Sequence, residues 1–250
     1  AFAVSLVATQ CKLGRIPFDA PEAETEIVSG PLVEYGGRYL AFLTFAKTSE
    51  LTVLLTLLVA AAAYCLSESL EARRSFYSGT SWRVWMMWGY VATGLAMLTQ
   101  GPVAFLMVMI PYFLATQSYH LRRPDWIHAP GLAVALGLGA SWPVWMSLKH
   151  PGCGVWGHWL GLKAGAAVMP ALPLGLFVAV AVLATLPWIP LAGAMVHRVF
   201  QREDRSPSLV FWVWSLLADF VLLALLSSRS GAFVLPVVMF ICLLAAQALA

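Results

Sequence analysis

Seven long apolar runs constrain what this chain can fold into, because each approaches the roughly 20 apolar residues that a helix needs to cross a bilayer. Charged residues make up 11% of the chain and hydrophobic residues 60%, whereas a soluble domain carries about 25% charged residues. The sequence therefore predicts an all-α, polytopic membrane protein with about seven spans plus an N-terminal stub. The stub is 1–11, and the expected spans are 39–66 (most cleanly 51–66), 84–99, 101–117, 130–147, 172–196, 208–226 and 232–250.

Prolines punctuate one of these runs. Pro173, Pro187 and Pro190 lie within 172–196, and an interior proline removes a helical hydrogen bond and clashes with the preceding turn. The sequence therefore predicts a kink or a broken end in this span.

Basic residues divide the connecting loops into two groups. Three loops hold eight arginines, and the loops between them hold only two lysines and one arginine. Cytoplasmic loops carry an excess of Lys and Arg, so the arginine-rich loops are expected to face the cytoplasm and the protein to lie in the cytoplasmic membrane. The loops expected inside are 67–83, 118–129 and 197–207, and those expected outside are 148–171 and 227–231.

Tryptophans follow the expected boundaries of the membrane, where indole rings are favoured. The expected outer loop 148–171 adds Trp156, His158 and Trp159. Aromatic side chains in an outward loop can stack on a sugar or an acyl chain, so these three are candidate contacts for such a ligand. The tryptophans expected at the membrane interface are Trp82, Trp85, Trp126, Trp145, Trp188 and Trp212.

Cysteines and histidines give no sign of a metal site. The four cysteines are scattered without a C-x-x-C pair, and the histidines lack ligand spacing. No basic stripe runs along the chain, which argues against a nucleic-acid partner. The sequence predicts no metal and no cofactor bound by this chain alone.

An acidic loop, residues 12–38, contrasts with everything around it. Five of the chain's 12 acidic residues fall between positions 19 and 34. Clustered carboxylates raise one another's pKa by mutual repulsion, so some could exchange protons near neutral pH, while Arg15 and Arg38 balance part of the charge. The acidic residues are Asp19, Glu22, Glu24, Glu26 and Glu34.

The acidic loop resembles one known family closely. Its segment Arg15-Ile-Pro-Phe-Asp-Ala-Pro-Glu-Ala-Glu-Thr-Glu26, followed by Val33-Glu-Tyr-Gly-Gly37, is similar to the quinone-site membrane subunit of respiratory complex I and of energy-converting membrane hydrogenases. That family usually has Ser where this chain has Gly36. The resemblance implies a cytoplasmic loop under hydrophilic redox subunits, with Arg15 and the five acids linked to proton transfer. Quinone is then the candidate cofactor for residues 1–50.

The remainder, residues 51–250, resembles the GT-C membrane glycosyltransferases, closest to the aminoarabinose-transferase and protein-mannosyltransferase-like group. The resemblance begins with Gly94-Leu-Ala-Met-Leu-Thr-Gln-Gly-Pro102 and runs through Arg122-Arg-Pro-Asp-Trp126 to Ser227-Ser-Arg-Ser230. It implies transfer of a sugar from a polyprenyl-phosphate donor at the outer face of the cytoplasmic membrane.

Departures from the transferase pattern weaken that expectation. The family lysine of T-K-G-P is Gln100, and the lysine that commonly follows S-R-S is Gly231. Arg229 and Gln100 remain as candidate contacts of the donor phosphate, although Gln100-Gly101-Pro102 also fits an ordinary helix-breaking turn. The first outer loop, which would carry the catalytic acid, is absent. No catalytic residue is identifiable, and the chain is not expected to catalyse transfer.

The two resemblances disagree about orientation. With one span between them, the acidic loop and the arginine-rich loop 67–83 must lie on opposite sides. However, the complex I family needs the acidic loop inside, and the arginine pattern places 67–83 inside as well. Either 39–66 does not cross, or the chain joins pieces of two proteins at a seam between Arg38 and Tyr64. We favour a composite, and both ends look cut within helices, as in a fragment.

Three functions therefore compete. Coverage favours a transferase-like membrane protein, whose partners would be membrane lipid and the polyprenyl-phosphate sugar. Motif specificity favours the alternative, a proton-translocating, quinone- or hydrogenase-linked membrane subunit whose partners would be hydrophilic redox subunits. The third is a polytopic membrane protein with neither activity.

Overall fold

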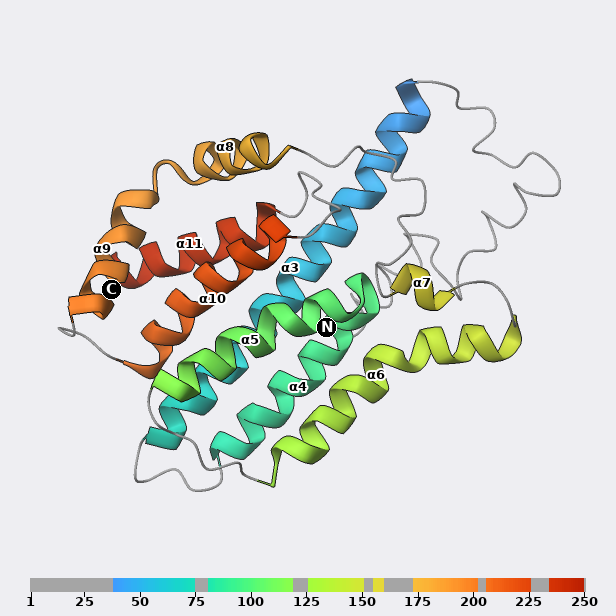
Figure 1. Ribbon diagram of the computed structural model, residues 1–250, viewed down its shortest axis with the longest axis horizontal. Helices are drawn as coiled ribbons and strands as arrows, with labels where there is room; N and C mark the ends of the chain where they lie inside the picture. Colours follow the sequence, from blue (N-terminus) through green and yellow to red (C-terminus); the bar gives the residue numbers. More distant parts are fainter. Residues whose placement is uncertain are drawn as a thin grey trace. The chain divides into compact units, whose positions relative to one another are not determined.

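A computed structural model describes residues 38–74, 81–118, 126–150, 155–159, 173–201, 206–225 and 234–249, and these residues are almost entirely helical (Figure 1). The chain divides into two compact units, residues 1–54 and 55–250. The all-α fold class is therefore confirmed for the described residues. The helices are α3 (Arg38–Arg74), α4 (Ser81–Gln100), α5 (Pro102–Ser118), α6 (His128–Lys149), α7 (Val155–Trp159), α8 (Leu174–Thr185), α9 (Ile189–Gln201), α10 (Pro207–Leu225) and α11 (Val234–Leu249).

Each expected span coincides with a helix or a helix pair. Within the described residues, two stretches are long and apolar enough to cross a membrane by themselves, Thr52–Arg73 in α3 and His128–Lys149 in α6. Three further apolar helices are shorter, namely Pro102–Ser118, Pro207–Leu222 and Leu235–Ala248. α3 has 37 residues and is therefore about 55 Å long at 1.5 Å per residue, well beyond the apolar thickness of about 30 Å.

The expected kink between residues 172 and 196 is confirmed. Gly175–Thr185 and Ile189–Val199 meet at 98°. The Trp188 amide donates a hydrogen bond to the Thr185 carbonyl at 2.8 Å, and the Thr185 hydroxyl donates one to the Ala181 carbonyl at 2.6 Å. Since Pro187 has no amide hydrogen to continue the helix, α8 ends in this turn and α9 starts in a new direction.

Helices α4 and α6 pack closely side by side (Figure 1). A Cβ at Gly94 would come within 2.9 Å of the Ala135 carbonyl oxygen, and a Cβ at Gly131 would overlap the Tyr90 ring. Small residues let helix backbones approach each other, which is the usual basis of helix association in a bilayer. The two helices therefore depend on glycine for their contact.

A second packing centre joins four helices. Met107 of α5, Phe177 of α8 and Val237 of α11 are buried together, and Leu216 and Phe220 of α10 pack against them. α10 contributes its second half to this cluster and begins, at Pro207, with a defined cap. The Ser206 hydroxyl accepts the Leu209 amide at 3.3 Å, and Pro207 occupies the first helical position, where its missing amide costs nothing.

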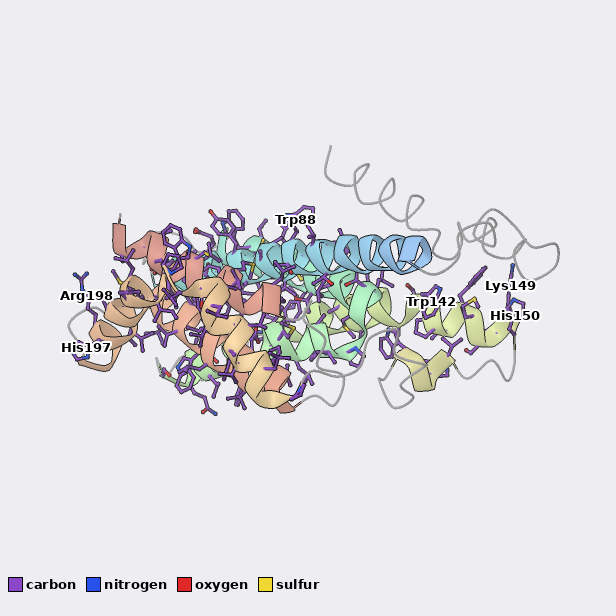
Figure 2. All side chains as sticks on the ribbon, turned by 90° about the horizontal axis from the view of Figure 1, so that it is seen from above. Trp88, Trp142, Lys149, His150, His197 and Arg198 are labelled. Atoms are coloured by element: carbon purple, nitrogen blue, oxygen red, sulfur yellow. The ribbon has the colours of Figure 1, made fainter. Side chains whose placement is uncertain are left out.

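Charged side chains mark the two ends of residues 55–250. Figure 2 shows Lys149 and His150 at the end of α6 and His197 and Arg198 at the opposite end, on α9. The loops that these residues adjoin, 148–171 and 197–207, are the ones whose arginine content predicts opposite faces. Between the ends, large apolar side chains such as Trp88 (60% exposed, Figure 2) and Phe113 are open to the surroundings, as expected for a surface in contact with lipid.

Candidate functional site

Many of the expected site residues lie outside the described ranges. This holds for Arg15, Asp19, Glu22, Glu24, Glu26 and Glu34 of the acidic loop, and for Arg229. Gln100 ends α4 and His158 lies in α7, and for both only the backbone is described. The roles expected for all of these residues stay predictions.

At the end of the bundle that carries Lys149, the structure brings together two segments 58 positions apart in the sequence. Gly101 has φ +69°, and a Cβ there would overlap the backbone oxygen of Trp159. The Gly101 amide donates to the Met97 carbonyl at 2.8 Å, so residues 100–102 form a helix-breaking turn. The turn and the short helix α7 are therefore in contact.

Helix α7 carries two of the three expected aromatic contacts, and one of them, Trp159, contacts this turn. The rings of Trp156 and Trp159 meet edge to face, with centroids 5.8 Å apart. Trp156 is exposed, while the Trp159 indole nitrogen is buried and has no hydrogen-bond partner among the described residues. An indole N–H donates only, so this group could serve an oxygen acceptor such as a hydroxyl or a phosphate.

At the opposite end, where α3 ends and α4 begins, cations and aromatic rings converge. The guanidinium carbons of Arg73 and Arg83 lie 5.1 and 5.4 Å from the centroid of the same Trp82 ring. Arg83 also lies 5.6 Å from the Trp126 centroid. Such distances are within the range of cation–π attraction. Both tryptophans were expected at the membrane interface, but the sequence could not predict that they share Arg83.

A histidine next to this end was also missed. His128, the first residue of α6, has its Nδ1 2.9 Å from the Tyr90 hydroxyl of α4. Its ring also contacts Tyr112 of α5, with centroids 6.0 Å apart. His128 stands alone in the sequence without any ligand spacing, so only the tertiary packing of three helices reveals its setting.

Helix α10 carries one acidic residue into the apolar interior. Asp219 is 0% exposed, and neither carboxylate oxygen has a hydrogen-bond partner among the described residues. An ionisable residue within a membrane span is costly and often functional. A signal was available in the sequence, because Asp219 is the single charged residue of the run 208–226.

Trp212 is buried within the protein. Its side chain is only 5% exposed and has ring contacts with Phe211 and Phe240, while its expected depth at the membrane interface stays a prediction. The reason is that α11 packs over this face of α10. Trp145, by contrast, is exposed and accepts Lys149 over its ring at 4.6 Å.

Metal-binding groups do not gather in the part of the chain that the structure describes. No three His, Cys, Asp or Glu side chains there are close enough to hold an ion. Cys65 and Cys242 are free thiols. The described geometry therefore supports contacts with lipids or with partner subunits and gives no arrangement of catalytic groups.

These features define a class of protein: an all-α, multi-pass protein of the cytoplasmic membrane. Comparison with known families adds a more particular similarity. The family model described as NADH dehydrogenase matches residues 1–110. These residues extend from the acidic loop through α3 and α4 into α5, and so they continue beyond both residue 50 and the expected seam.

Curated relatives agree with this match over a shorter stretch. The H subunit of NADH-quinone oxidoreductase from Geobacillus thermodenitrificans is 49% identical over 47 residues, which cover 19% of this chain and 14% of the relative. The corresponding protein of Thermomicrobium roseum is 43% identical over 53 residues, 21% of this chain and 16% of the relative. The chain thus spans only about one seventh of the length of these relatives. No solved structure matches.

The comparisons reverse the order of the two leading interpretations. Coverage had favoured the transferase, but the family match supports the alternative, a membrane protein similar to a complex I component, for residues 1–110. The resemblance of residues 51–250 to glycosyltransferases stays a prediction, as do the division at residue 50 and the seam.

Proposed function

We propose that residues 1–110 act as a membrane subunit of a complex I-like NADH–quinone oxidoreductase. The observation that carries this proposal is the family match over these residues, which contain the complete acidic segment from Arg15 to Glu26. Identity of 49% over 47 residues to the Geobacillus thermodenitrificans protein supports the same conclusion. The proposal concerns a component of a larger assembly, because the relatives are much longer than the matched segment.

The acidic loop would work at the cytoplasmic face of that assembly. Its carboxylates, Glu22, Glu24 and Glu26 among them, would exchange protons and contact the hydrophilic redox subunits, with quinone bound close by. Arg15 would offset part of the negative charge. Helix α3 follows directly and would anchor the loop, since it carries a 22-residue apolar stretch from Thr52 to Arg73.

The continuity of α3 bears on the conflict between the two orientations. An unbroken helix with an apolar stretch long enough to cross favours one crossing between the acidic loop and residues 75–83. The acidic loop and the arginines at positions 73, 74 and 83 would then face opposite sides. Since both are expected inside, either residues 39–66 do not cross the membrane or the chain joins pieces of two proteins.

Labelling of a cysteine in the acidic loop tests the proposed function. In a background where the four native cysteines are serine, Ser29→Cys would be exposed to a membrane-impermeant maleimide in intact cells and after permeabilisation. We expect protection in intact cells and labelling only after permeabilisation, because the loop must face the cytoplasm to meet redox subunits.

Ser118→Cys, at the end of α5, is the matched control, and it should be labelled in intact cells if position 29 is inside. Three crossings, α3, α4 and α5, separate it from position 29, so the two cysteines should react from opposite sides. Labelling of Ser29→Cys in intact cells would contradict the redox function and would agree with the orientation of the transferase-like part.

A transferase-like function for the larger part stays the second candidate. The observation that favours it is the contact between the Gly101 turn and α7, since both belong to segments of the transferase resemblance or its outer loop. This end would receive the phosphate or sugar of a polyprenyl-phosphate donor through Gln100, Trp156, His158, Trp159 and Arg229.

A further inference from the structure

We propose that Asp219 is a proton-binding site inside the membrane. In the folded protein its carboxyl group holds a proton at neutral pH, and it passes this proton to water when α10 separates from its neighbours. The site lies outside residues 1–110, so it is independent of the proposed redox function. Asp219 is 0% exposed, and neither carboxyl oxygen has a hydrogen-bond partner among the described residues.

An ionised carboxylate at this position would lack the contacts that a buried charge requires. Removing a lone carboxylate from water is far more costly than removing a neutral polar group. A buried charge is tolerated only where an opposite charge or additional hydrogen bonds compensate for the lost water. A carboxyl group that keeps its proton avoids the larger cost, so burial without a partner favours the acid form.

The polar side chains nearest to Asp219 along α10 use their donors elsewhere. The Ser215 hydroxyl, one turn earlier, donates a hydrogen bond to the Phe211 carbonyl at 2.9 Å. The Trp214 indole nitrogen donates one to the Ser118 hydroxyl of α5 at 3.1 Å. Neither donor is therefore left to stabilise a carboxylate at position 219.

The helices that surround α10 do not supply a partner either. α10 packs against α5, α9 and α11, and Leu216 and Phe220, on either side of Asp219, pack into an apolar cluster. The basic residues of α9, His197 and Arg198, are exposed at one end of the protein (Figure 2). None of the titratable groups on these helices, or at the end of α3 that meets α10, is a hydrogen-bond partner of Asp219. They are Tyr112 in α5, Cys242 in α11, His197 and Arg198 in α9, and Glu68, Glu71, Arg73 and Arg74 in α3.

Carbon-13 NMR of the full chain in lipid nanodiscs, labelled at the aspartate carboxyl carbon, tests the site directly. The chain has four aspartates, Asp19, Asp125, Asp204 and Asp219. We expect one signal to keep the chemical shift of the acid form from about pH 5 to about pH 8, where an ordinary aspartate is ionised. Asp219→Asn should remove that signal. Four signals at the carboxylate shift would overturn the proposal, as would an acid-form signal that persists in Asp219→Asn.

Glu71→Gln is the matched control, because it also removes a carboxyl group that contacts α10. Glu71 Oε1 accepts hydrogen bonds from the Ser208 amide at 3.1 Å and the Ser208 hydroxyl at 2.8 Å, so it has the donors that Asp219 lacks. Ser208 lies roughly 16 Å along the helix from Asp219. The acid-form signal should therefore be unchanged in Glu71→Gln, and its loss there would contradict burial at position 219 as the cause.

The melting temperature tests the release of the proton. If the folded protein holds a proton that the unfolded chain loses, stability falls as the pH rises. The melting temperature of the unmodified chain minus that of Asp219→Asn should therefore fall by several degrees between about pH 5 and about pH 8. A difference that stays constant or rises would overturn the proposal. If Asp219→Asn does not fold, Asp219→Leu replaces it in both experiments, since leucine cannot ionise and suits an apolar interior.

Discussion

At the scale of the residue, Gly101 shows how one backbone conformation joins two distant segments. Its φ of +69° lies in the left-handed region, and its lack of a Cβ lets the Trp159 backbone approach. Other residues adopt this conformation at a cost of about 1–3 kcal/mol. Gly101 therefore serves both the turn between α4 and α5 and the contact with α7.

Gly101→Ala should destabilise the protein by about 1–3 kcal/mol, because alanine is strained at this φ and its Cβ would also overlap Trp159. The melting temperature in detergent measures the loss. Gly137→Ala is the control, since no atom lies within 4 Å of a Cβ there and alanine is favoured over glycine within a helix by roughly 0.5–1 kcal/mol. Equal melting temperatures for the two variants would contradict the proposed role of Gly101.

At the scale of the element, the contact between α4 and α6 is held by more than glycine. The Tyr90 ring fills the space over Gly131, and its hydroxyl is fixed by His128 at 2.9 Å. The ring therefore has little freedom to move aside for a larger residue. Glycine and the tyrosine–histidine pair act on the same contact.

Gly131→Ala should cost about 1–3 kcal/mol, as overpacking of a well-packed site usually does. Tyr90→Phe should cost about 0.5–1.5 kcal/mol through the lost hydrogen bond. Because the freed ring can shift away from the methyl group introduced by Gly131→Ala, the combined variant should lose less than the sum of the two single variants. Unfolding of the set in detergent gives the coupling, and strict additivity would show that His128 does not restrain the ring.

Elements were easier to predict than their contacts. Hydropathy alone located the helices to within several residues, and prolines located the break between α8 and α9. The sequence does not show which helices pack against each other, because any apolar helix face can pack against another. The burial of Trp212 under α11 was therefore not expected, and neither was the shared stacking of Arg73 and Arg83 on Trp82.

The candidate site residues also differ in how well the sequence alone predicts them. The turn at Gly101 was foreseen as one alternative, since Gly-Pro punctuates helices. Asp219 could have been noticed as a lone charge in an apolar run. His128 could not, because its hydrogen bond to Tyr90 depends on the packing of α6 along α4.

At the scale of the whole molecule, the orientation of the chain in the membrane bears on whether it derives from one protein or from two. The match to NADH dehydrogenase covers residues 1–110, whereas the arginine-rich loops continue to position 205. One continuous helix, α3, connects the acidic loop to the first of these loops. A single native membrane protein that kept both groups inside would need a further crossing between them.

A long sequencing read of the source DNA across the codons for residues 1–250, extended on both sides, tests the composite origin, which predicts a frame that breaks between Arg38 and Tyr64. Each part would then be interpreted within its own family. An uninterrupted frame in independent reads would contradict the composite origin. The acidic loop would then need a function that is compatible with the outer face.

The buried carboxyl group of Asp219 also has a consequence for how the protein is made. On the scale of insertion by the translocon, an aspartate at the centre of a helix costs about 2.5–3.5 kcal/mol, while each Leu, Ile, Phe or Val returns about 0.3–0.6 kcal/mol. The 11 Leu, Val and Phe residues of α10 together return about 3–7 kcal/mol, so at the lower end of this range they only just offset the cost. Helices that are already next to the translocon should therefore help α10 to enter the membrane. The first such helix in the chain is α5, which packs against α10 in the fold and could shield the acid.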